Sequence, residues 1–136
     1  MNRKLLTRVK QEEIAPDKPV FSISIVADIL EVHQRTLRIY NEEEILVPAR
    51  SPKNRRLYSL NDIEKGKFVQ YLSRQLGINI VGIKMIFELL QELNISSQNY
   101  KQHLDKIATK LKITEEMQQM NREKLSKRGR KPSKVS

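Results

Sequence analysis

The sequence predicts a mainly α-helical fold, and three observations support this prediction. Apolar residues recur every three or four positions over residues 60–76 and 80–93, as they do on the buried face of an amphipathic helix. Two shorter segments, residues 24–30 and 33–40, show the same spacing and lie close together in the chain. A narrower apolar stripe within residues 104–111 predicts a further helix near the C-terminus.

The net charge is strongly positive and unevenly distributed. The 136 residues carry a formal charge of +10, which favours a polyanionic partner. Residues 122–136 hold +6 of this charge, whereas residues 20–93 hold only +1. The second basic segment is a turn at residues 50–56, which contains four cations and no acid: Arg50, Lys53, Arg55 and Arg56. A uniformly basic surface would not give this pattern, so the charge predicts localised binding.

The composition excludes several kinds of site. There is no cysteine, so disulfides, thiolate metal sites and iron–sulfur clusters are excluded. His33 and His103 are too few and too distant in sequence to predict a metal site, and no cofactor is expected. No nucleophile–base set, phosphate-binding glycine loop or carboxylate pair stands out, so we do not expect an enzyme. No apolar run approaches the roughly 20 residues that span a bilayer. We therefore expect a cytoplasmic protein without membrane association.

The N-terminal segment is predicted to be an arm followed by a short helix. Residues 1–19 should be flexible, because Pro16 and Pro19 end any local helix. Phe21-Ser-Ile-Ser alternates apolar and polar residues, so it is either a short strand or a lead-in to the core. Ser24 is the expected N-cap of the helix, whose apolar face comprises Ile25, Val26, Ile29 and Leu30.

The next helix, His33 to Tyr40, completes a helix-turn-helix candidate. Polar side chains surround its apolar Leu37, and an extended connector at residues 45–48 leads to the basic turn at 50–56. A basic short helix followed by a basic turn can place one element in a DNA groove and the other on the phosphate backbone. The pattern therefore predicts a DNA-binding regulator that binds double-stranded DNA.

Two longer helices should supply core residues. The first is predicted over Leu60 to Leu76, ended by Gly77. Gly66 lies inside it and predicts a close contact with the backbone, at a cost of about 1 kcal/mol relative to alanine. The expected buried face consists of Ile63, Phe68, Tyr71, Leu72 and Leu76. Asn79 is the expected cap of the second helix, whose buried face should comprise Ile83, Ile86, Phe87, Leu90 and Leu93.

Residues 94–125 are predicted to form a dimerisation helix. After the polar break at residues 94–99, a stripe of Leu104, Ile107 and Leu111 is too narrow to be buried within one chain, so it needs a partner helix. The alternative is a helix that folds back on its own domain. Beyond Leu111 the apolar pattern weakens, so the end of the helix is not fixed. Residues 126–136 are predicted to be a disordered basic tail that binds phosphates non-specifically or binds a partner.

Residues 20–93 resemble the winged-helix MerR superfamily of bacterial transcription regulators. The resemblance rests on three ordered motifs: Thr36-Leu37-Arg38-x-Tyr40, Leu46-x-Pro48-x-Arg50 and Asn54-Arg55-Arg56-Leu57-Tyr58-Ser59. Asp62-Ile63 and the segment from Gly77 to Lys84 are similar to the subgroup of the heat-shock repressor HspR and the nitrogen regulators GlnR and TnrA. The resemblance implies a winged helix-turn-helix domain, and a dimerisation helix that forms an antiparallel coiled coil in a homodimer on inverted-repeat operators.

The resemblance also implies roles for individual residues of the recognition helix. Arg35 is the candidate to bind the edge of a guanine base, because its planar guanidinium can donate hydrogen bonds to two acceptors. Thr36, Arg38 and the hydroxyl of Tyr40 are better placed to contact phosphates and to fix the register of the helix on the DNA. The predicted contacts from this helix are Gln34, Arg35, Thr36, Arg38 and Tyr40.

The wing is implied to hold the DNA backbone. Its cations should bind phosphates, and Tyr58 would contact either bases or phosphates. Core packing with a hydrogen-bonded hydroxyl is the other role expected for Tyr40 and Tyr58, and it is compatible with the DNA contact. The predicted contacts from the wing are Arg50, Lys53, Arg55, Arg56 and Tyr58.

Two residues depart from the family pattern. Many family activators carry two tyrosines after the arginine, and one helps to distort the promoter; here the first is Ile39, which favours repression. Glu44 stands where the family commonly has glycine. If that position needs a positive φ, glutamate costs about 1 kcal/mol unless the turn is rebuilt.

The absence of cysteine argues against the family's metal and redox sensing, so a protein corepressor is expected. In the heat-shock branch this partner is the chaperone DnaK, and in the nitrogen branch it is glutamine synthetase. Ser73-Arg-Gln-Leu-Gly-Ile-Asn is most similar to the heat-shock branch. We therefore expect a repressor of heat-shock or chaperone genes. The alternatives are a nitrogen regulator, and an architectural nucleoid protein that discriminates little between sequences.

Overall fold

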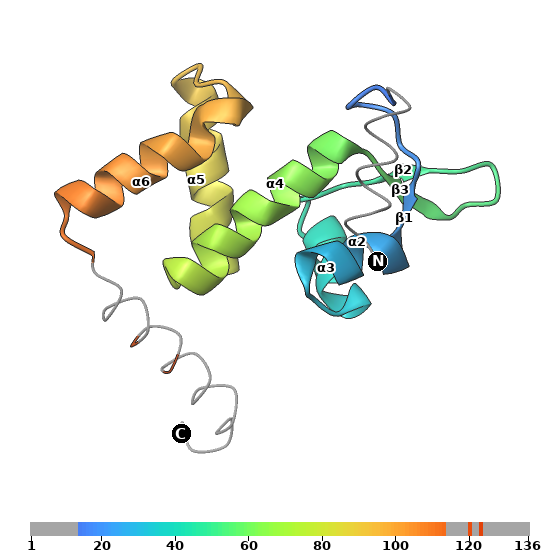
Figure 1. Ribbon diagram of the computed structural model, residues 1–136, viewed down its shortest axis with the longest axis horizontal. Coiled ribbons are helices and arrows are strands. Elements are labelled where there is room, and N and C mark those ends of the chain that lie inside the picture. Colours follow the sequence, from blue (N-terminus) through green and yellow to red (C-terminus); the bar gives the residue numbers. More distant parts are fainter. Residues whose placement is uncertain (1–13, 114–119, 121–122, 124–136) are drawn as a thin grey trace. The chain divides into compact units, whose positions relative to one another are not determined.

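A computed structural model describes residues 14–113 together with Met120 and Glu123. The chain divides into two compact units, with the boundary between Lys67 and Phe68. Figure 1 shows the order of the elements along the chain. The first unit contains helices and short strands, and the second unit is helical in the part that the structure describes.

The first unit combines a small sheet with three helices. Strand β1 pairs with β3, and β3 pairs with β2, all antiparallel, with Phe21 opposite Tyr58 and Ala49 opposite Leu57. The elements of this unit, of which the last continues into the second unit, are β1 (Phe21–Ser22), α2 (Ile23–Leu30), α3 (Gln34–Glu42), β2 (Ala49–Arg50), β3 (Arg56–Tyr58) and α4 (Leu60–Gln70).

Helix α2 begins two residues earlier than predicted. The Oγ of Ser22 accepts a hydrogen bond from the Ile25 backbone N–H at 3.4 Å, so Ser22 rather than Ser24 is the N-cap. The Ser24 Oγ instead pairs with the Ser22 Oγ. The segment Phe21-Ser-Ile-Ser, expected to be either a short strand or a lead-in to the core, is divided between two elements. Its first two residues form β1 and its next two begin α2.

Helix α4 begins with reciprocal hydrogen bonds between Ser59 and Asp62. The Asp62 backbone N–H donates to the Ser59 Oγ at 3.0 Å, and the Ser59 N–H donates to the Asp62 carboxylate at 2.9 Å. Gly66 marks the predicted close approach, since a Cβ there would lie 2.6 Å from the Leu30 Cδ1. The interior of the first unit is mainly apolar, and its buried hydrophobic side chains are Phe21, Val26, Ala27, Leu30, Leu37, Tyr40, Ile45, Leu46, Tyr58 and Ile63.

The predicted flexible arm is partly attached to this unit. The Asn61 N–H donates to the Pro16 carbonyl at 3.0 Å, and the Val20 N–H donates to the Tyr58 carbonyl at 3.0 Å. Pro16 is therefore hydrogen-bonded to the first unit, and the flexibility of residues 1–19 stays a prediction. Residues 1–13 lie outside the described residues.

In the second unit, the helix predicted over residues 60–76 changes its winding. The α4 segment is followed by a π-helical turn, Tyr71–Gln75, which the sequence pattern did not predict. Gly77 then adopts φ 68°, which confirms the predicted helix end. Asn79 caps the next helix, α5 (Ile80–Glu92), because its Oδ1 accepts from the Gly82 N–H at 2.9 Å.

Aromatic rings fill the interior of the second unit. Phe68 makes an edge contact with Phe87 at a centroid distance of 5.6 Å, and both rings contact Tyr100. The Tyr71 hydroxyl donates to Asp105, and the Lys101 ammonium lies 5.1 Å from the Tyr71 ring centroid. These contacts fix helix α6 (Tyr100–Lys110) against the π-helical turn.

One prediction for this unit is corrected. Leu93 was expected on the buried face of α5, but it lies at the helix end and is exposed. Within the described residues, the helix predicted over residues 94–125 is confined to α6, which ends at Lys110, and its role in dimerisation stays a prediction. Lys112 then adopts φ 59°, and the Ile113 N–H donates to the Ala108 carbonyl at 2.9 Å. The tail at residues 126–136 lies outside the described residues.

Candidate nucleic-acid interface

Helix α3 presents a polar face opposite a buried face. Leu37 and Tyr40 are buried, whereas Arg35 and Arg38 are exposed on the other side. The Arg38 Nη2 donates to the Gln34 Oε1 at 3.3 Å, one helical turn away. Thr36 is half-buried, and its backbone N–H bonds to the His33 carbonyl. The helix therefore offers two exposed guanidinium groups to a ligand, one of them oriented by a glutamine.

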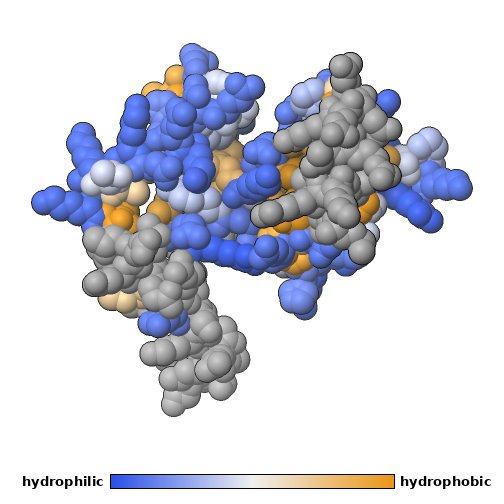
Figure 2. All heavy atoms as spheres, in the orientation of Figure 1, coloured by the Kyte–Doolittle hydropathy of each residue, from blue (hydrophilic) through white to orange (hydrophobic). Residues whose placement is uncertain are grey.

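The β2–β3 hairpin carries the basic turn. The Asn54 N–H donates to the Ser51 carbonyl at 2.8 Å, and the Arg55 N–H donates to the Ser51 Oγ at 3.1 Å. Asn54 adopts φ 65°, a conformation that asparagine tolerates better than most residues. Figure 2 shows the hydrophilic surface of this hairpin. Its exposed cations are Arg50, Lys53 and Arg55.

Arg56 connects the hairpin to helix α3. Its Nε donates to the Asn41 Oδ1 at 3.1 Å in a partly buried position. Arg56 is also the cross-strand partner of Arg50, whose Nη1 donates to the Asn54 carbonyl at 3.1 Å. Two arginines directly opposite each other repel, so these hydrogen bonds help to fix each guanidinium. Asn41 is the residue of this site that the sequence interpretation did not include.

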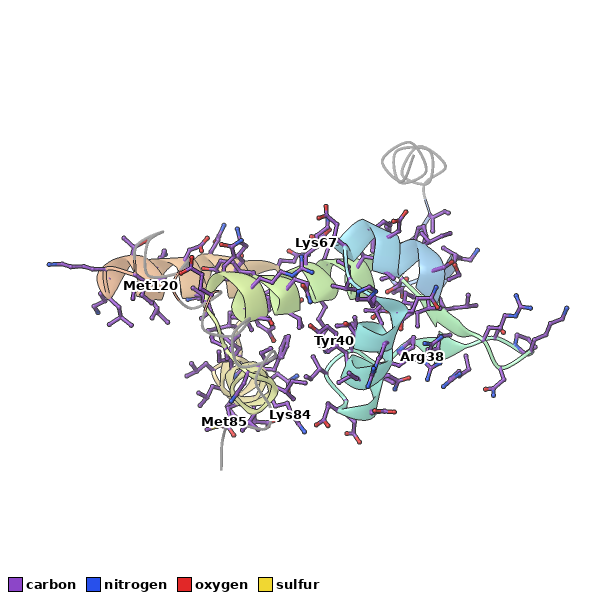
Figure 3. All side chains as sticks on the ribbon, turned by 90° about the horizontal axis from the view of Figure 1, so that it is seen from below. Arg38, Tyr40, Lys67, Lys84, Met85 and Met120 are labelled. Carbon is purple, nitrogen blue, oxygen red and sulfur yellow. The ribbon has the colours of Figure 1, made fainter. Side chains whose placement is uncertain are left out.

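Tyr58 lies beneath these cations. Its ring is fully buried, and its hydroxyl has no hydrogen-bond partner within the part of the chain that the structure describes. Burial raises the pKa of Tyr58, while the positive charges of Arg56, Arg50 and Arg38 oppose the rise. Three guanidinium groups, from α3, β2 and β3, therefore act electrostatically on the hydroxyl of one buried tyrosine. Figure 3 shows Arg38 on the side of α3 nearer the hairpin.

Both tyrosines of the predicted interface are buried. The hydroxyl oxygen of Tyr58 is inaccessible to solvent, as the packing interpretation expects, and its contact to bases or phosphates stays a prediction. Tyr40 is also buried in the core, and a phosphate contact from its hydroxyl stays a prediction.

The described residues contain no candidate for a metal site or for a membrane-spanning helix. No group of three or more His, Cys, Asp or Glu side chains among them is arranged to hold a metal ion. None of the helices described is long and apolar enough to cross a membrane. Two short helices followed by a basic β-hairpin define a winged helix-turn-helix domain, a class of protein that binds DNA.

Comparison with known proteins is in agreement. Residues 21–90 match the MerR HTH family of regulatory proteins. The chain is 38% identical over 106 residues to a protein of Streptomyces coelicolor named as heat shock protein HspR, covering 76% of this chain and 70% of that protein. It is 32% identical over 112 residues to the HTH-type transcriptional regulator GlnR of Bacillus anthracis, covering 82% and 81%. The regulator TnrA of Bacillus subtilis is 39% identical over 49 residues, covering 36% and 44%.

The chain belongs to the MerR family. It is a transcriptional regulator with a DNA-binding helix-turn-helix domain, and two of the relatives above, GlnR and TnrA, are named as HTH-type transcriptional regulators. The predicted similarity to the HspR and GlnR/TnrA subgroup is confirmed by these matches.

Proposed function

We propose that this regulator is a repressor of heat-shock or chaperone genes that binds an inverted-repeat operator as a homodimer. The observation that carries the proposal is the pairing of an exposed basic helix face on α3 with an exposed basic hairpin in the same unit. The helix suits the major groove, where base edges differ, and the hairpin suits the phosphate backbone.

Within this proposal, the contacts divide by chemistry. Arg35 reads a guanine edge, and its exposed guanidinium has the two parallel donors that such an edge requires. The remaining cations neutralise phosphates and fix the register of the domain on the duplex. The proposed phosphate contacts are Arg38, Arg50, Lys53, Arg55 and Arg56. Gln34 and Thr36 are proposed as further DNA contacts from α3, through their shorter, uncharged side chains.

Repression is favoured over activation by Ile39. This residue is partly exposed on α3, beside the proposed contacts, where many family activators carry a tyrosine. An isoleucine has no hydroxyl to donate to a phosphate, so it lacks the polar contact through which a tyrosine would hold distorted DNA.

The homodimer is proposed to form through α6. Ile107 and Leu111 are 50% and 64% exposed, which suits an apolar stripe that a second copy covers. Leu104 is half-buried in its own unit and contributes less surface. Within the described residues, α6 offers about three helical turns to this interface.

The heat-shock branch is preferred because the match to HspR has the higher identity over a similar length. We propose a chaperone of the DnaK type as corepressor. The nitrogen branch, with glutamine synthetase as the partner, is the second candidate, since the match to GlnR covers slightly more of the chain.

Selection of binding sites from a random duplex pool, with the protein alone at physiological salt, tests this proposal. We expect an enriched inverted repeat whose half-sites are about one helical turn apart. Its occurrence upstream of chaperone genes or of glutamine-synthetase genes would separate the two branches. A pool without a shared motif would contradict sequence-specific binding by the protein alone and would favour the architectural alternative.

A further inference from the structure

Helix α5 carries an apolar row that its own unit leaves uncovered. Four residues at intervals of four are exposed, although the opposite face of the same helix is buried. Single exposed apolar residues are common, but a continuous row on one helix marks an interaction surface. The exposed fractions are 64% for Val81, 61% for Met85, 54% for Leu89 and 67% for Leu93.

This row is distinct from the stripe on α6. Ile83, Phe87 and Leu90 form the buried face of α5. Figure 3 shows Met85 and Lys84 pointing away from α6, so α6 of the same chain does not cover them. The second unit therefore presents two separate apolar surfaces.

We propose that the α5 row pairs antiparallel with the α5 row of a second copy of this chain. The row is symmetric about Phe87: Met85 and Leu89 lie two residues to either side, and Val81 and Leu93 lie six. An antiparallel pair would place Met85 against Leu89, and Val81 against Leu93, twice each. Such self-complementarity is what a two-fold symmetric interface requires.

The charges along the edge of the row favour the same direction. Lys84, Glu88 and Glu92 also recur at intervals of four and are exposed beside the apolar residues. Antiparallel pairing brings Lys84 of one copy to the level of Glu88 and Glu92 of the other. A parallel two-fold pair would place the charged edges of the two copies on opposite sides of the seam, so Lys84 would gain no glutamate partner from this edge of the other copy.

The proposed α5–α5 interface has a small area, so it should form mainly when two copies are held close together. Four side chains per copy bury less area than the roughly 800 Å² per partner of a standard stable interface. Pairing should therefore be weak in dilute solution and become populated when neighbouring sites on one DNA hold two copies close together. In this role α5 would make binding to adjacent sites cooperative. That role rests on the proposed operator binding, whereas the pairing itself does not.

Disulfide trapping tests the pairing directly, because the chain has no cysteine of its own. The Met85→Cys and Leu89→Cys variants are oxidised separately and as a mixture, at high protein concentration and without DNA. We expect the mixed disulfide to form severalfold faster than either homodimer. Gln98→Cys, at an exposed position outside the row, gives the rate of random collisions. Homodimers that dominate, or a mixed rate equal to that of Gln98→Cys, would overturn the proposal.

A second measurement separates this surface from α6. The trapping is repeated in a chain that carries Ile107→Lys and Leu111→Lys, with circular dichroism to verify the fold. We expect the mixed disulfide to persist, because the α5 pair does not need the α6 stripe. Its loss in a folded variant would show that α5 residues meet only through an α6 dimer, and would overturn the proposal. Failure of operator selection would leave the trapping result unchanged.

Discussion

The guanidinium of Arg56 is hydrogen-bonded to the side chain of Asn41, with 3.1 Å between Nε and Oδ1, although the two residues are 15 positions apart. Arg56 lies on strand β3 and Asn41 lies in the last turn of α3. The bond therefore ties the hairpin to the recognition helix. Because Asn41 is neutral, it orients Arg56 without cancelling its positive charge, which remains for a phosphate.

The Asn41→Ala substitution should weaken DNA binding without unfolding the domain. Loss of one partly buried hydrogen bond costs about 1 kcal/mol of stability. The freed Arg56 should then lose its fixed position, so affinity for all duplexes should fall severalfold. Fluorescence anisotropy and thermal unfolding, with Glu42→Gln at the neighbouring exposed position as control, would measure both effects. An unchanged affinity would show that Asn41 does not position Arg56 for DNA.

Arg35→Ala should change the base preference of the protein. If Arg35 bonds a guanine edge, its loss should cost about 1–3 kcal/mol for the preferred site and relax the requirement for that base. Competition between the selected duplex and single-base variants would measure this. Equal losses on all sequences would instead assign Arg35 to the phosphate backbone.

Arg55→Ala should weaken binding to every duplex to a similar extent. Arg55 is exposed at the hairpin tip, where a phosphate contact carries no sequence information. Removing one such contact should lower the slope of log K against log salt concentration by about 1. A titration series in salt checks this, and a loss confined to one sequence would assign base readout to the hairpin.

Glu44→Gly should stabilise the protein. Glu44 adopts φ 59° after α3, so the expectation of a left-handed residue at this position is confirmed and the turn is not rebuilt. A left-handed conformation costs a non-glycine residue about 1–2 kcal/mol, of which the greater flexibility of unfolded glycine offsets a part. We expect a gain of about 1 kcal/mol by denaturant unfolding. Glu42→Gly, inside the helix, should lose a similar amount.

Tyr71→Phe should alter stability at alkaline pH. Burial, then the hydrogen bond to Asp105 and the Asp105 charge, raise the pKa of the Tyr71 hydroxyl. Because unfolding restores the ordinary pKa of about 10, this stability is present below pH 10 and is lost as pH rises above it. The phenylalanine variant should show a shallower decline of unfolding free energy above pH 10. Asp105→Asn, which removes the charge, should show an intermediate slope.

The sequence predicted those features that depend on neighbouring residues. Gly77 and Asn79 were assigned correctly because a left-handed glycine and an asparagine cap act within one turn of the helix. Ser22 and Ser24 are equally good caps by type, so the pattern could not choose between them. The pairing of Phe21 with Tyr58 decides this, since it ends β1 at Ser22.

Features set by distant contacts were not predictable. The Asn41–Arg56 bond joins segments whose proximity depends on the fold, and no periodicity marks Asn41. The burial of Tyr58 likewise follows from its place on the central strand of the sheet. Leu93 continues the apolar spacing of α5 but lies beyond the packed part of the helix, so spacing alone overestimated the core.

The π-helical turn at Tyr71–Gln75 has a consequence for comparing this chain with its relatives. A π turn contains about one residue more than an α turn, so it corresponds to a one-residue insertion accommodated without breaking the helix. A relative whose helix stays regular would reach the same end point with one residue fewer. Alignment across this helix then needs a one-residue gap, and without it every position after Tyr71 would be assigned about 100° away from its true direction around the helix axis.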